Sequence, residues 1–176
     1  MSRSAADHSI LRIHDALRPG FGTEAAVYGT ILVSGLIALA SYAGETSIHV
    51  LIKVGVTVVV FWGAHVYAGT VARMGERAGP EARAQLGQAF RGSLRHSLGM
   101  LTSASLPALI LVLGTTRIIP DEIANDVALW SGVVILAFLG YVAFLRRGSS
   151  HLVRIAGALA TASFGLAFVV MKALIH

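Results

Sequence analysis

The stretch from Ile48 to Thr70, IHVLIKVGVTVVVFWGAHVYAGT, constrains the fold more than any other part of the sequence. A helix needs about 20 mostly apolar residues to cross a bilayer, and this stretch is long enough. It also carries His49, Lys53 and His65. An ionisable side chain at membrane depth costs roughly 2.5 to 3.5 kcal/mol on insertion scales, so it usually faces other protein or a polar cavity. The stretch therefore predicts a transmembrane helix with three ionisable side chains within it or at its edge, and these residues raise the question of function.

The composition agrees with a membrane protein that crosses the bilayer several times. Of the 176 residues, 55% are hydrophobic and 13% are charged, whereas about a quarter of the residues of a soluble domain are charged. The net charge of +5 comes from arginines in short segments between apolar runs, where membrane topology explains them better than nucleic-acid binding does. The chain has no cysteine, which excludes disulfides, thiolate metal sites and cysteine nucleophiles.

The apolar runs predict an all-α, polytopic transmembrane helical bundle of about five spans, with short interfacial amphipathic helices. Residues 1-22 are expected to form a cytoplasmic tail with an amphipathic segment, and residues 23-176 a single bundle domain. A second amphipathic helix is expected to begin at Pro80-Glu81 and to lie in the interface before the third span. The predicted spans are residues 24-43, 48-70, 98-114, 127-145 and 153-174.

The positions of the arginines predict the orientation. Lysine and arginine in short loops mark the cytoplasmic side of a membrane protein. With five spans, the N-terminal tail, the link between spans 2 and 3 and the link between spans 4 and 5 share one side, and these segments hold most of the arginines. The N terminus is therefore expected in the cytoplasm and the C terminus outside. Lys53 is shallow enough to extend to the interface as an anchor.

A candidate site lies near the inner end of the first helical hairpin. In two antiparallel helices, each pair of residues at equal depth has residue numbers that add up to about the same value. By this rule Glu24 is level with Tyr67, and Tyr28 is nearly level with His65. A carboxylate beside an imidazole can exchange protons, so Glu24, Tyr28, His65 and Tyr67 are candidates for a proton or ion site. The alternative is structural: Glu24 caps the first span, the aromatic residues form an interfacial belt, and His65 holds helices together by hydrogen bonds.

The third span is unusually polar. It contains Thr102, Ser103, Ser105 and Pro107, and a proline inside a helix removes a backbone hydrogen bond and frees a carbonyl. Two structures are compatible with this pattern, a kinked structural helix or a discontinuous helix that lines a path.

The fifth span has small residues at four-residue intervals. Gly157, Thr161 and Gly165 lie on one face, and small residues let helices approach closely. This predicts a packing face, either inside the bundle or for a homo-oligomer.

Membrane histidines also raise the question of haem or zinc. His49 and His65 are too far apart on one helix to share one iron. His96 and His151 are expected at the inner surface, where either could complete a site with His65, or with His65 and Glu24 around zinc. No segment has metal-motif spacing, so no metal, cofactor or catalytic residue is predicted. The lipid bilayer is the expected partner, nucleic acid is not, and protein partners are unknown.

The residues EAAVYG at 24-29 and FWGAHVYA at 61-68 resemble those of small uncharacterised integral membrane proteins of actinobacteria. The resemblance covers mainly the first hairpin and implies a multi-pass protein of the bacterial inner membrane, without implying a chemistry. Two functional hypotheses follow from the sequence. One is a small proton or cation channel or transporter; the other is a non-catalytic accessory or scaffold subunit of a membrane complex. An enzyme is not expected.

Overall fold

A computed structural model describes residues 24–74 and 82–175; the amphipathic segment predicted in residues 1-22 lies outside this range. Every regular element in the described residues is an α-helix. The prediction of an all-α bundle of five spans is confirmed, because each of the five helices is long and apolar enough to cross a membrane. They are α2 (Glu24–Tyr42), α3 (Ser47–Met74), α4 (Ala82–Thr115), α5 (Asp121–Arg146) and α6 (His151–Ile175).

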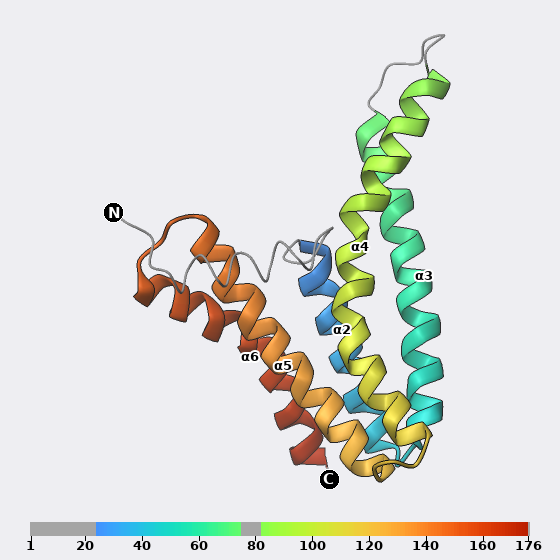
Figure 1. Ribbon diagram of the computed structural model, residues 1–176, viewed down its shortest axis with the longest axis vertical. Coiled ribbons are helices and arrows are strands. Elements are labelled where there is room, and N and C mark those ends of the chain that lie inside the picture. The colour runs from blue at the N-terminus through green and yellow to red at the C-terminus, as the bar shows by residue number, and fades with distance from the viewer. Residues whose placement is uncertain (1–23, 75–81, 176) are drawn as a thin grey trace.

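Two antiparallel helix pairs form most of the molecule (Figure 1). In one pair α3 lies beside α4, and in the other α5 lies beside α6. The pairs meet at the end that carries the α2–α3 and α4–α5 links, here called the link end, and they diverge toward the opposite end (Figure 1). The shorter helix α2 contacts all four of the others. It therefore joins the two pairs, together with the direct contact between α4 and α5.

The hydrophobic core lies where α2, α3, α4 and α5 meet. Its fully buried side chains include Val33 and Ile37 of α2, Val50 of α3, Leu111 of α4 and Leu129 of α5. Close packing in a membrane depends on small residues, since lipid is as apolar as leucine. Gly132 of α5 accordingly lies against Ser34 and Thr30 of α2, with no room for a larger side chain.

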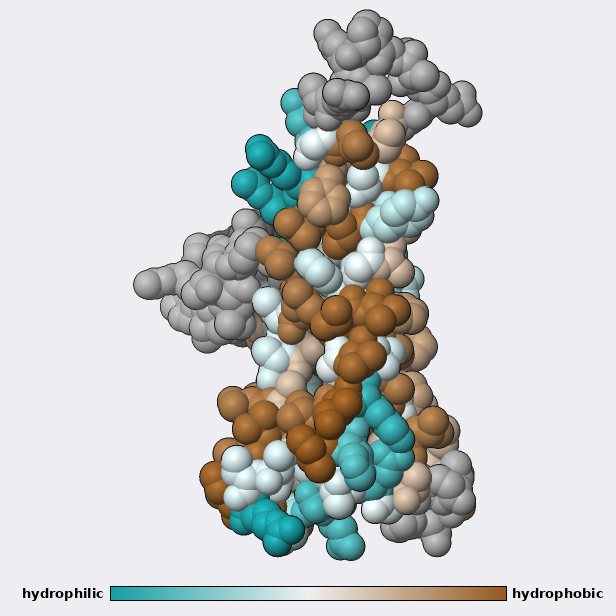
Figure 2. Space-filling model, turned by 90° about the vertical axis from the view of Figure 1, so that its right-hand side faces the viewer, coloured by the Kyte–Doolittle hydropathy of each residue, from teal (hydrophilic) through white to brown (hydrophobic). Residues whose placement is uncertain are grey.

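The outer faces of the bundle are apolar. In α3 and α6 only 22% of the span residues are buried inside the molecule, and the exposed side of α3 carries Ile52, Val56, Val59 and Val60. Figure 2 shows hydrophobic residues over most of the height of one face, with hydrophilic residues gathered mostly toward its ends. Exposed apolar surface of this extent requires lipid or another protein against it. The chain is thus a multi-pass integral membrane protein.

The third span differs from the prediction in its length. The expected interfacial helix and the expected span 98-114 form one continuous helix, α4, which begins at Ala82. The first half of α4 packs along the second half of α3, where Gly69 lies against Ser93. This contact gives the segment a protein partner in α3, so it continues the helix of the third span as one element.

The links are fixed by hydrogen bonds at the helix ends. Gly44 ends α2 with a φ of 68°, a left-handed conformation that glycine adopts without steric cost. The N–H groups of Gly44 and Glu45 donate to the carbonyls of Ser41 and Ala40, the pattern of a Schellman cap. At the start of α3, the backbone N–H of Ser47 donates to Oδ1 of Asp121 at 2.9 Å. This bond ties the α2–α3 link to the first residue of α5.

Removing this tie is expected to destabilise the link end. Asp121→Ala leaves the Ser47 N–H without its acceptor, which we expect to lower the free energy of unfolding. Asp121→Asn keeps a side-chain oxygen as acceptor and should recover most of that loss. Denaturant titration of the purified protein in detergent measures both. Equal losses in the two variants would mean that the charge stabilises the link and the hydrogen bond does not.

Candidate functional site

Two histidines from neighbouring spans lie together. His65 of α3 and His96 of α4 have ring centroids 6.4 Å apart and ring planes inclined by only 15°. The register of the helix pair brings them together. Gly69 of α3 lies against Ser93 of α4, and about one turn farther along the antiparallel pair the same alignment sets His65 against His96. Nη1 of Arg73 also reaches Oγ of Ser93, to which it donates at 2.6 Å. This pair is called the histidine pair below.

The described residues show no hydrogen bond, ion pair or ring contact between the histidine pair and the other residues of the predicted inner site. Glu24 is exposed in the first turn of α2, and Tyr28 is 53% exposed. No hydrogen bond in the described residues joins either of them, or Tyr67, to His65. The depth argument placed these residues level along the hairpin but could not give their direction. In the structure α3 packs chiefly along α4, and the small face of α2 at Gly29 packs on Met100 and Ser103 of α4.

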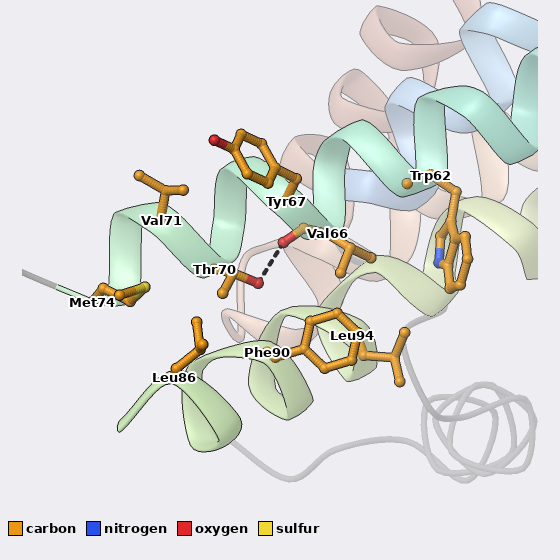
Figure 3. A pocket seen from close by; sticks show the side chains of 10 residues that line it. Trp62, Val66, Tyr67, Thr70, Val71, Met74, Leu86, Phe90 and Leu94 are labelled. Carbon is orange, nitrogen blue, oxygen red and sulfur yellow. Dashed lines mark hydrogen bonds between the residues drawn. The ribbon is translucent and has the colours of Figure 1, made fainter. Parts of the chain in front are cut away.

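Tyr67 lies at the rim of an apolar groove between α3 and α4. The groove has a volume of about 400 Å³, and Figure 3 shows its side chains. The hydroxyl of Thr70 donates to the carbonyl of Val66 in its own helix at 2.7 Å (Figure 3), so it offers little polarity to the groove. The groove is lined from α3 by Trp62, Val66, Tyr67 and Thr70 and from α4 by Leu86, Phe90 and Leu94.

The hydroxyl groups of the third span bond to their own helix. Thr102 donates to the carbonyl of Gly99, Ser103 to that of Met100 and Ser105 to that of Thr102, at 2.7 to 3.1 Å. The helix continues through Pro107, which is buried. The alternative of a discontinuous helix is therefore wrong for this span, and the hydroxyl hydrogens are already used within α4.

The small-residue stripe of α6 lies against α5. Gly157 contacts Phe144, and Gly165 contacts Val133. The hydroxyl of Thr161 donates to the carbonyl of Gly157 at 2.8 Å. Of the two uses predicted for this face, the structure places its residues in an internal helix contact.

A polar cavity opens at the link end. It has a volume of about 390 Å³, and it gathers residues that are distant in sequence, from the α2–α3 link, the start of α5 and the end of α6. We call it the acidic cavity, because four of its lining residues are carboxylic acids. Its residues are Ser41, Gly44, Glu45, Thr46, Asp121, Glu122, Asn125, Asp126 and Lys172.

Hydrogen bonds and ion pairs organise the acidic cavity, but they leave several acceptors unused. Lys172 pairs with Asp126, and Lys53, predicted as an interface anchor, pairs with Glu45. Nδ2 of Asn125 donates to the backbone carbonyl of Glu45 at 3.1 Å. Three buried oxygens of its lining have no hydrogen-bond partner among the described residues: Oγ of Ser41, Oε2 of Glu45 and Oδ1 of Asn125.

Sequence reasoning missed the acidic cavity because no single segment contains it. The segment DEIAND at 121-126 lies between the predicted spans 98-114 and 127-145, and in the structure it is the first turn and a half of α5. One signal was available: with five spans, the first link, the third link and the C-terminal end of the last span all fall on the same side of the membrane.

We compared the chain with known protein families, curated proteins and solved structures, and none of the three comparisons gives a match.

Proposed function

We propose that this chain is a small channel or transporter that moves protons or small cations across a membrane, with the histidine pair as its protonatable group. The observation that carries the proposal is the meeting of His65 and His96 on two adjacent spans. Histidine is the side chain whose charge changes between pH 5 and 8, and ionisable residues within spans usually serve a pathway or a proton relay.

The depth of the pair supports this role. His65 lies about 27 Å along α3 from Ser47, at about 1.5 Å per residue, which is near the inner edge of a hydrocarbon layer about 30 Å thick. His65 is half-buried and His96 is exposed. At this depth the pair lies next to the arginine-rich side, from which a proton would enter. Glu24, Tyr28 and Tyr67 are left out of the proposed group, because they make no described contact with it.

A rival function is that of an accessory or scaffold subunit, and one observation favours it. The spans of α3 and α6 bury only 22% of their residues inside the chain, so long apolar faces are free for another membrane protein as well as for lipid. In that case the polar residues serve only helix packing.

Proton flux into liposomes separates these functions. Liposomes that contain the purified chain should take up protons faster than protein-free liposomes under an imposed potential, with a rate that changes between pH 5 and 8. A subunit that only packs against partners gives the protein-free rate at every pH. That result would remove the transport proposal, and co-purification of partners would become the next step.

A further inference from the structure

The acidic cavity combines negative charge with buried acceptors that lack donors. Asn125 is only 3% exposed and Ser41 only 9%, and both line the cavity. Oδ1 of Asn125 and Oγ of Ser41 have no hydrogen-bond partner among the described residues, and the same holds for Oε2 of Glu45. A buried polar atom without a partner costs free energy, so the site is built to receive groups that donate hydrogen bonds.

The charges around the cavity favour a cation. Its lining holds the four carboxylates and one internal cation, Lys172, which pairs with Asp126. From outside the lining, Lys53 pairs with Glu45, and Arg117 lies close enough to act on Asp121. Three cations thus act on the four carboxylates, which leaves one negative charge in excess. The remaining carboxylate is Glu122, which has no ion-pair partner among the described residues.

The form of the site favours an ammonium group over a bare metal ion. Within residues 24–74 and 82–175, no three histidine, aspartate or glutamate side chains lie close enough together to hold a metal. The cavity of about 390 Å³ is instead in the size range of small-molecule sites. A primary ammonium offers three N–H donors, which matches three unpartnered oxygens, and Lys172 is an amine that already occupies one side of the cavity.

From this match we infer that the acidic cavity binds a small primary amine in its ammonium form. The site is at the link end, which faces the outside in the predicted orientation. Its role as the entry or exit of a transported cation rests on the proposed function, but the binding itself does not.

The test is calorimetric titration of the purified full-length chain in detergent at pH 7 and constant ionic strength, with 1,4-diaminobutane as the probe. We expect saturable binding of 1,4-diaminobutane and none of tetramethylammonium, which carries the charge without N–H donors. Glu122→Gln should weaken binding about tenfold, because it removes the unpaired carboxylate. Glu24→Gln makes the same change at the start of α2, the end of that helix that lies away from the cavity, and it should leave the affinity unchanged.

A second variant guards against loss of folding as an explanation. Lys172→Met frees Asp126 from its internal cation, so the probe should bind about tenfold more tightly. A merely damaged protein would not gain affinity. The inference is overturned if 1,4-diaminobutane gives no saturable heat, if tetramethylammonium binds equally well, or if Lys172→Met weakens binding. Proton flux can persist when binding is absent, and binding when flux is absent, so the two proposals fail separately.

Discussion

His65→Ala and His96→Ala are each expected to reduce proton flux into liposomes about tenfold or more, which corresponds to about 1.4 kcal/mol on the barrier. Each variant removes one ring of the histidine pair, whose centroids are 6.4 Å apart on α3 and α4. The remaining imidazole then has no second protonatable group beside it to receive the proton. The measurement is the initial rate of proton uptake at equal protein content, scanned from pH 5 to 8.

Two further variants separate proton handling from folding. His65→Gln keeps a polar side chain of similar size that does not titrate, so it should fold normally and lose flux as His65→Ala does. His49→Ala removes an exposed histidine of the same helix and should keep the wild-type rate. If both His65 variants conduct at the wild-type rate, the pathway avoids the histidine pair and that assignment is wrong.

The spans were predictable from the sequence because bilayer thickness sets the length of an apolar run. The five predicted spans correspond to the five helices, since a helix is the simplest structure that satisfies its own backbone in lipid. The extent of α4 was not predictable in the same way. Residues such as Leu86 and Phe90 have an amphipathic spacing that suits an interface as well as a helix partner, and only the packing against α3 decides between them.

The candidate site was harder to predict than the fold, because hydropathy gives depth and does not give direction. His65 and Tyr67 lie two residues apart on α3, and yet one meets His96 and the other lines the apolar groove. The acidic cavity needed still more information. Glu45, Asn125 and Lys172 come from three separate segments, and their meeting depends on how the helix pairs converge.

Gly140→Ala is expected to lower the free energy of unfolding by about 1 to 3 kcal/mol. Gly140 of α5 lies against α6 so closely that an added Cβ would be 2.4 Å from the backbone carbonyl oxygen of Gly157 and 2.4 Å from Oγ1 of Thr161. The threonine side chain can rotate, but the carbonyl belongs to the helix backbone. The two helices must therefore move apart, which weakens contacts along the whole α5–α6 pair.

The same substitution on a lipid-facing glycine provides the matched control. A Cβ added at Gly55 of α3 meets nothing within 4 Å, and alanine is favoured over glycine inside a helix by up to about 1 kcal/mol. Gly55→Ala should therefore stabilise the protein slightly, whereas Gly140→Ala destabilises it. Unfolding by SDS titration in mixed micelles measures the change in the free energy of unfolding for both variants. If Gly140→Ala were as stable as Gly55→Ala, the close contact between α5 and α6 described here would be wrong. The small-residue stripe of α6 would then be free to bind a second copy of the chain.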